Sequence, residues 1–457
     1  MSIESLIFAL LGAVAAGMAP FVPVSWRLGL SLTLSVFQLY VIPAGSVTFS
    51  LWLASTYLLW PELLSELRNL GRMPAFRTLM LLMLVQIISW SWSPDVVAGF
   101  RNLIYTLPFL LLGAGTFSLA KADPSGFMKL LKILPACMLV EAFLVVLFRL
   151  DPDAKWYYLN SGFAGLFSGP NTVKQFLAQM GVTDDYLALG KAGGFLLNGN
   201  VAAAYLGIGA MTAHFIAKEN RSLLFRAIAY ILWGSVFFAG SKFGDILAVI
   251  VPPATFYLSR SPPDRGARRS LKIVLVAGCA LIVGYEVART FGTELYSTWF
   301  VRHTIKTAGF RLVIWAYALH AFLGSPILGL GFGGWKAGFA SYAQLVHISA
   351  KLPPQNELVH LWSDSGIVAA LVGLLFMFQV IRHAVMLVAS RSDVVKATGL
   401  ALFSVAGWTF VHGMASNAGM LGDVHQLPLL ASLVGLSYAV EFRFELTKRI
   451  ALALALT

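Results

Sequence analysis

Long apolar runs separated by short polar turns fill most of the chain. They lie near residues 5–23, 27–43, 46–64, 76–93, 99–120, 128–149, 194–216, 225–240, 243–259, 272–289, 358–382, 397–417 and 427–443. An α-helix needs about 20 apolar residues to cross a bilayer, and a helix satisfies its own backbone hydrogen bonds there. The alternating pattern of a membrane β-barrel is absent from the sequence. The pattern therefore predicts an all-α, polytopic helical membrane protein with about 12–13 transmembrane helices.

Basic residues gather in four of the turns between these runs and near the C-terminus. They are Arg68, Arg72 and Arg77; Lys218, Arg221 and Arg226; Arg260, Arg265, Arg268, Arg269 and Lys272; Arg382, Arg391 and Lys396; and Arg443, Lys448 and Arg449. Counting spans puts all five groups on one side, which the positive-inside rule makes the cytoplasmic side. Two longer loops, 150–193 and 290–357, then face the periplasm, where we expect short surface helices. We expect the whole chain, 1–457, to form a single integral membrane domain.

The composition supports a membrane protein and excludes several other classes. The chain is 58% hydrophobic and only 12% charged, against about 25% charged in soluble domains, and its mean hydropathy is +0.77. The net charge of +12 lies in turns between spans, so we expect no nucleic-acid partner. Cys137 and Cys279 both fall in apolar runs, and no metal-ligand spacing occurs. We therefore expect no disulfide framework, metal or cofactor, and we see no cleavage site of a removed signal peptide.

The segment 300–369 concentrates polar groups that membrane sequences tolerate poorly, and such a concentration suggests a functional site. Arg311 lies in the second long loop, and Arg302, His303 and Lys306 precede it. These cations could anchor to lipid headgroups at the bilayer surface. The positive-inside rule disfavours so many cations on the outer face, however, and a diphosphate ligand would supply the missing countercharge. We therefore predict that this group binds phosphate.

Two further cations lie at predicted outer boundaries of spans. Lys242 follows Gly240 and Ser241 in a short outer turn, and Asp245 lies on the same helix face. A simple ion pair at a helix start would explain Lys242 and Asp245. The alternative is that Lys242 holds a lipid diphosphate at the membrane surface. Arg101 begins another span and is a weaker candidate of the same type.

Gln355, Asn356, Glu357, His360 and Asp364 form a polar cluster at the start of a predicted span. In a helix, Asn356, His360 and Asp364 are four residues apart and share a face. Glycosyl transfer needs a base that takes the proton of the acceptor hydroxyl, and His360 or Glu357 could serve. A lone histidine at a span end is also a common interfacial residue.

Aromatic residues in the first long loop could contact a glycan. Trp156 and Tyr157 lie in the polar segment DPDAKWYYLNSGF, and aromatic faces pack against the apolar faces of sugars. An interfacial aromatic belt would explain the same residues, and the sequence leaves both interpretations open.

The order of several segments resembles a known family. These are SPDVVAGFRNLIYTLPFLLLG, GGFLLNGNVAAAYL, GSKFGDILAV, FRLVIWAYALHAFLGSPILGLGFGGW and PPQNELVHLWSDSGIVAALVGLL, which together span about residues 90–385. They resemble the superfamily of O-antigen ligases and O-antigen or exopolysaccharide polymerases. The resemblance implies a polytopic enzyme of the bacterial inner membrane that transfers undecaprenyl-diphosphate-linked glycans at the periplasmic face, without metal or nucleotide. Expected partners include the glycan acceptor, a flippase and chain-length regulators.

The resemblance also implies roles for individual residues. Arg311 and Trp315 match an R-x-x-x-W motif whose arginine is essential, and Lys242 stands where the family usually has arginine. Asn356 and Gly366 match the asparagine and glycine of an outer motif. The histidine of that motif is missing from this sequence, and Pro354 and Gln355 stand at its position. This departure favours a polymerase over a ligase.

The sequence therefore predicts a polymerase that joins repeat units of a surface polysaccharide. Lys242 and Arg311 would neutralise the diphosphate leaving group, and Asn356 with Glu357 or His360 would orient or deprotonate the acceptor hydroxyl. The rival activities are a ligase that transfers glycan to lipid A core, a transporter of lipid-linked sugars, and a non-catalytic scaffold. A transporter would be expected to show two related halves, which the sequence lacks.

Overall fold

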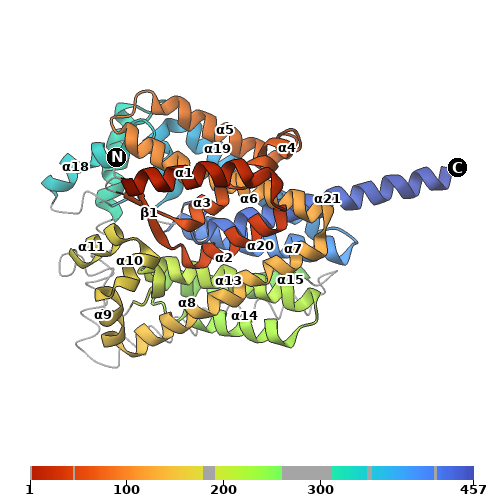
Figure 1. Ribbon diagram of the computed structural model, residues 1–457. Helices are drawn as coiled ribbons and strands as arrows, with labels where there is room; N and C mark the ends of the chain where they lie inside the picture. The colour runs from red at the N-terminus through yellow and green to blue at the C-terminus, as the bar shows by residue number, and fades with distance from the viewer. Residues whose placement is uncertain are drawn as a thin grey trace.

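The computed structural model describes residues 3–44, 47–178, 191–259, 311–346, 352–415 and 419–456 (Figure 1). The fold is 81% helical, which confirms the predicted all-α class. Within the described residues, six helices are long and apolar enough to cross a membrane, or seven if one bent pair forms a single span. The six are α6 (Val96–Ala122), Pro124–Leu150, α13 (Gly199–Glu219), α19 (Glu357–Val388), α20 (Asp393–Gly413) and Leu427–Phe444 of α21 (Leu427–Leu456).

The other predicted spans fall on shorter or interrupted helices. They include α1 (Ile3–Met18), the 3-10 turn η1 (Ala19–Phe21), α2 (Val24–Phe37), α14 (Leu223–Val236) and α15 (Lys242–Ser259). Pro124–Leu150 comprises α7 (Pro124–Leu131) and α8 (Ile133–Leu150). The predicted span 272–289 lies outside the described residues.

The predicted spans 27–43 and 46–64 are not continuous helices. Helix α2 ends at Phe37, and Gln38 and Leu39 adopt positive φ angles that redirect the chain. A two-stranded antiparallel hairpin follows, made of β1 (Tyr40–Ala44) and β2 (Val47–Ser50). Ser50 then caps α3 (Leu51–Tyr57) by accepting a hydrogen bond from the Leu53 N–H. The chain here changes direction at capped helix ends rather than crossing in one run.

Helices α4 (Trp60–Leu70) and α5 (Pro74–Trp90) form the bent pair, with an angle of 110° between them. Helix α4 carries carboxylates on its buried face. Glu62 pairs with Arg27 of α2 through two hydrogen bonds of 2.5 Å, and Glu66 pairs with Lys121 of α6. Because each buried carboxylate has a cationic partner, α4 can pack inside the helical assembly.

Both long loops contain the short helices that the sequence predicts. The first holds α9 (Pro152–Asn160), α10 (Gly162–Ser168) and α11 (Pro170–Ala178), and the 3-10 turn η2 (Gly194–Leu196) directly follows it. The second holds a helix over Arg311–Gly324 and α18 (Trp335–Leu345). Figure 1 shows α9, α10, α11 and α18 at the left end of the molecule, and the C-terminal part of α21 projecting from the other end. That the loop end faces the periplasm stays a prediction.

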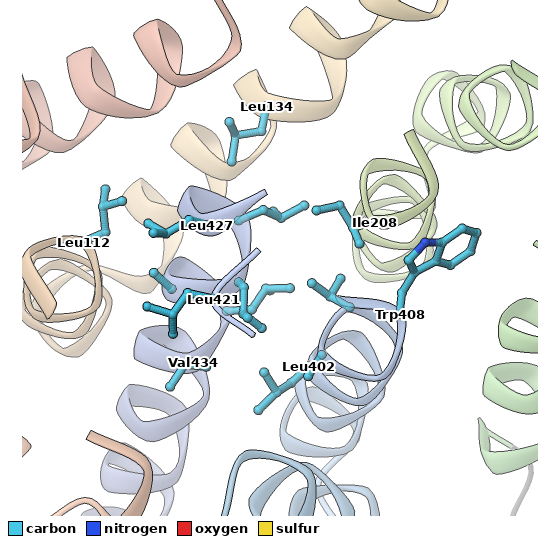
Figure 2. Close-up of a cluster of buried hydrophobic side chains, with 14 of the residues drawn as sticks. Leu112, Leu134, Ile208, Leu402, Trp408, Leu421, Leu427 and Val434 are labelled. Carbon is cyan, nitrogen blue, oxygen red and sulfur yellow. The ribbon is translucent and has the colours of Figure 1, made fainter. Parts of the chain in front are cut away.

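A continuous apolar core joins the long helices (Figure 2). Its labelled members come from α6, α8, α13, α20, α21 and the segment before α21: Leu112, Leu134, Ile208, Leu402, Trp408, Leu421, Leu427 and Val434. Helices α13 and α20 approach closely, because a Cβ atom added at Gly207 would lie 2.2 Å from the Trp408 ring. This packing fixes α20, whose C-terminal end lies beside the candidate site.

Candidate functional site

A break in helix α19 receives the Gly-rich turn that precedes α18. Gly366 has φ 80° and ψ 179°, a conformation open essentially to glycine alone. The turn pairs with both sides of this break, since the Leu330 N–H donates to the Ser363 carbonyl at 2.8 Å and the Ile367 N–H donates to the Pro326 carbonyl at 3.1 Å. A Cβ atom at Gly366 would lie 1.8 Å from the Ile327 oxygen. The turn and the break therefore form one unit.

Asp364 fastens this unit to the start of α18. Its carboxylate accepts hydrogen bonds from the Gly333 N–H at 2.8 Å and the Trp335 N–H at 2.9 Å. A carboxylate at a helix N-terminus satisfies N–H groups that lack partners inside the helix. The turn also contacts the end of α5 and the residues after it, where Trp92 donates from Nε1 to the Leu328 carbonyl at 3.2 Å. Both carboxylate oxygens of Asp364 are thus engaged in hydrogen bonds to backbone N–H groups.

The helix Arg311–Gly324 is hydrogen-bonded to the segment just before α19. Arg311 donates from Nε to the Gln355 side-chain oxygen at 3.0 Å, and Trp315 donates from Nε1 to the Pro354 carbonyl at 2.9 Å. One helical turn separates the two side chains, so both reach the same segment. Gln355 has a φ of 56°, which is uncommon for a residue other than glycine. The R-x-x-x-W pair therefore holds a bent backbone immediately before α19.

The same segment is joined to the C-terminal end of α20. Arg311 donates from Nη2 to the Ala415 carbonyl at 2.9 Å, and Asn356 donates from Nδ2 to the Met414 carbonyl at 3.0 Å. The Asn356 side-chain oxygen caps α19 by accepting from the Val359 N–H at 3.1 Å. Asn356 therefore precedes the helix as its N-cap residue, and both ends of its amide are occupied.

Lys242 also lies near the end of α20. It begins α15, and its side chain is exposed. The ring of the next residue, Phe243, lies 6.0 Å from the ring of His412 in the last turn of α20, three residues before the Ala415 carbonyl that Arg311 binds. The structure thus brings Lys242 and Arg311 to the same helix end.

A cavity of about 340 Å³ lies between α5, α6, the first turns of α19 and the segment 419–427. Its polar lining consists of Gln86, Asn102, Tyr105, Thr106, Glu357, His360, Asp364 and Asp423. The His360 ring lies between two carboxylates, with Nδ1 3.9 Å from Glu357 Oε2 and Nε2 3.9 Å from Asp364 Oδ2. The predicted base candidates Glu357 and His360 therefore share one cavity.

Asp423 and His425 form a pair that the sequence analysis missed. Asp423 Oδ1 lies 2.6 Å from His425 Nδ1 and accepts a second hydrogen bond from the His425 N–H at 3.1 Å. Burial alone would raise the pKa of Asp423, but its hydrogen bond with His425 and the charge of that ring lower the pKa below its ordinary value. The segment GDVHQLP, polar and directly before the last span, carried the signal that could have pointed to it.

The remaining predicted site residues lie outside the cavity lining or outside the described residues. Arg101 is exposed on α6, next to the lining residue Asn102. Trp156 and Tyr157 are 49% and 77% exposed on α9, and neither lines the cavity. Arg302, His303 and Lys306 lie outside the described residues. Among the residues that the structure describes, no group of three or more His, Cys, Asp or Glu side chains could hold a metal ion.

Comparison with known proteins returns no family model that matches the chain and no curated protein that matches it. The class is therefore defined by the fold: the chain is a polytopic helical membrane protein whose apolar helices embed it in a lipid bilayer.

Proposed function

We propose that the protein is a glycosyltransferase of the bacterial inner membrane that polymerises undecaprenyl-diphosphate-linked oligosaccharide units into a surface polysaccharide at the periplasmic face. The proposal rests on the resemblance of the sequence motifs to O-antigen ligases and polymerases. One structural observation carries it further. A guanidinium group, Arg311, is bonded to the segment from which Glu357 and His360 enter a polar cavity.

In this mechanism Arg311 and Lys242 bind the diphosphate. The bond between the anomeric carbon of the donor sugar and the diphosphate oxygen breaks, and negative charge develops on the leaving undecaprenyl diphosphate. Cations placed where that charge develops stabilise the transition state. Arg311 uses Nε and Nη2 for protein contacts, and its Nη1 makes no hydrogen bond to any residue in the described ranges. That edge of the guanidinium is available for a phosphate oxygen.

The acceptor hydroxyl attacks the anomeric carbon, and Glu357 or His360 takes its proton. Their separation of 3.9 Å places a carboxylate beside an imidazole, which is a suitable arrangement for general base catalysis. Asn356 and Trp315 act as positioning residues in this scheme, because their side-chain hydrogen bonds hold the segment that carries Gln355 and Glu357.

The test uses the full-length protein, purified in detergent and supplied with an undecaprenyl-diphosphate oligosaccharide, a chelator and no nucleotide. We expect a ladder of products spaced by one repeat unit and release of undecaprenyl diphosphate. A parallel reaction contains lipid A core as acceptor. Transfer to lipid A core without a ladder would identify a ligase instead.

A third reaction distinguishes catalysis from transport. The protein is reconstituted in vesicles with the lipid-linked donor, and both product formation and movement of the donor between leaflets are followed. Donor that moves between leaflets but stays chemically unchanged would overturn the proposed glycosyltransferase. The Arg311→Ala variant serves as the negative control for product formation.

A further inference from the structure

The cavity between α5, α6 and α19 is rich in hydrogen-bond acceptors and poor in cations. Glu357, Asp364 and Asp423 line it, whereas none of its lining residues is a lysine or arginine. His360 is the single basic side chain in the lining. Its volume of about 340 Å³ is at the small end of ligand sites. A cavity of this kind suits one small polar ligand that donates hydrogen bonds, and it is unsuited to a phosphate.

Gln86 supplies an independent sign that a ligand belongs there. This α5 side chain lines the cavity, is only 7% exposed, and its Oε1 makes no hydrogen bond within the described part of the chain. Buried polar atoms in native proteins almost always have a partner, so an unpaired one needs an explanation. The oxygen itself has less than 1 Å² of accessible surface, so a ligand hydroxyl would provide the missing donor once the amide turns toward the cavity that Gln86 lines.

The carboxylates differ in how much of their accepting capacity is already used. Both oxygens of Asp364 are bonded to backbone N–H groups. Asp423 is bonded to His425 through Oδ1, and its Oδ2 makes no hydrogen bond to a described residue. Asp423 Oδ2 and Gln86 Oε1 are therefore two acceptors at one cavity, contributed by different elements.

We propose that this cavity is the acceptor subsite of the enzyme and that it selects sugars without acidic groups, binding an amino sugar best, a neutral sugar next and a uronic acid worst. The proposal rests on the proposed function. In this arrangement the donor and the acceptor bind at places of opposite charge. The diphosphate of the donor lies at Arg311, and the acceptor sugar lies among carboxylates. The acceptor hydroxyl then lies beside Glu357 and His360, where a base is available.

The test measures binding, without turnover, of three methyl glycosides to the full-length protein in detergent. They are a glucosaminide, a glucoside and a glucuronide, followed by saturation-transfer NMR. We expect affinity to fall in that order. In Gln86→Leu, loss of one neutral hydrogen bond should weaken all three by roughly three- to tenfold. In Asp423→Asn, loss of the negative charge should reduce the preference for the glucosaminide over the glucuronide.

The exposed Gln344 of α18 offers a matched control, since Gln344→Leu removes the same group at a residue that does not line the cavity. Equal binding of glucosaminide and glucuronide, no binding of any probe, or equal effects of Gln86→Leu and Gln344→Leu would overturn the proposal. Because the assay needs no donor, its outcome is independent of the polymerase reaction. Selective binding without any product ladder would keep the cavity as a sugar-binding site and would remove the proposed polymerase function together with the acceptor role.

Discussion

Arg311 donates a hydrogen bond from Nε to the side-chain oxygen of Gln355 at 3.0 Å, across 44 residues of sequence. The contact joins a helix of the second long loop to the backbone bend before α19. Since Nη2 of the same guanidinium binds the Ala415 carbonyl, one side chain ties together three segments of the site. Arg311 is therefore both a structural clamp and the proposed phosphate ligand, and substitution can separate the two roles.

Arg311→Ala should reduce product formation by about 10²–10³-fold, the usual loss when a transition-state donor is removed. Arg311→Lys keeps the positive charge but loses the planar fork, so it should retain part of the activity while weakening the clamp. Product ladders and unfolding midpoints in detergent measure both effects. The exposed Arg391 provides a control, and Arg391→Ala should behave as wild type in both assays. Normal product length and yield from Arg311→Ala would contradict the proposed role.

Lys242 is proposed to act through its charge alone. Its exposed side chain lies at the start of α15, so Lys242→Arg should stay active, whereas Lys242→Gln should lose transfer activity and bind the donor more weakly. Donor binding, measured separately from product formation, checks this prediction. Equal activity of the glutamine and arginine variants would exclude Lys242 from diphosphate binding.

Gly366 should be intolerant of any side chain. Its backbone conformation costs about 1–3 kcal/mol for other residues, and the added Cβ would collide with the Ile327 carbonyl. Gly366→Ala should therefore lower the unfolding midpoint and separate the Gly-rich turn from α19. Gly407→Ala is the matched control, because a Cβ atom at Gly407 in α20 meets nothing within 4 Å. That variant should be neutral or more stable by about 0.5–1 kcal/mol. Similar midpoints for the two variants would contradict the geometry of the break.

Asn356 should contribute through its helix cap and through its bond to α20. Asn356→Ala loses both, whereas Asn356→Ser can still cap α19 but cannot reach the Met414 carbonyl as the amide does. We expect wild type to be most stable, serine intermediate and alanine least stable, with the cap worth about 0.5–2 kcal/mol. Chemical unfolding in detergent measures the series. If serine and alanine unfold together, the cap contributes nothing here.

Hydropathy and helical spacing could predict the helical class and the local relationships within the site. Arg311 and Trp315 are one helical turn apart and bind the same segment, as their spacing indicates. His360 and Asp364 also share a face. The prediction counted Asn356 as helical, whereas Asn356 is the N-cap residue directly before α19, which begins at Glu357. Local pattern is a good guide to neighbours on one element because helix geometry fixes them.

Contacts between distant segments could not be predicted in the same way, and neither could turns, which lack a periodic pattern of apolar residues. Nothing in the spacing of the Gly-rich turn shows that it fits the break at Gly366, because that fit depends on close approach of two backbones. Asp423 and His425 are two residues apart, a spacing that separates side chains on a helix, and only the turn before α21 brings them together. The β1–β2 hairpin had a local sequence signal, a Gly-Ser pair with β-branched residues within a few positions on both sides, which the apolar runs on either side concealed.

Asp423 predicts how the stability of the protein depends on pH. Its pKa is lowered in the folded state below the ordinary value of 3.8, so the unfolded chain binds the proton more readily. The stabilisation is therefore fully present above pH 3.8 and is lost as the pH falls through the lower, folded pKa. Asp423→Asn cannot titrate, so its deficit relative to wild type should be large at neutral pH and should shrink on acidification below about pH 4.

Unfolding midpoints of wild type and variant, measured in one detergent from neutral pH to below the ordinary Asp range, test this dependence. Asp153→Asn, at an exposed position on α9, is the control and should follow the wild-type curve. His425→Gln removes the ring that opposes the effect of burial, so it should raise the pKa of Asp423 and reduce the stability that is lost on acidification. If the unfolding midpoints of wild type and Asp423→Asn differed by the same amount at every pH, folding would not lower the pKa of the Asp423 carboxyl.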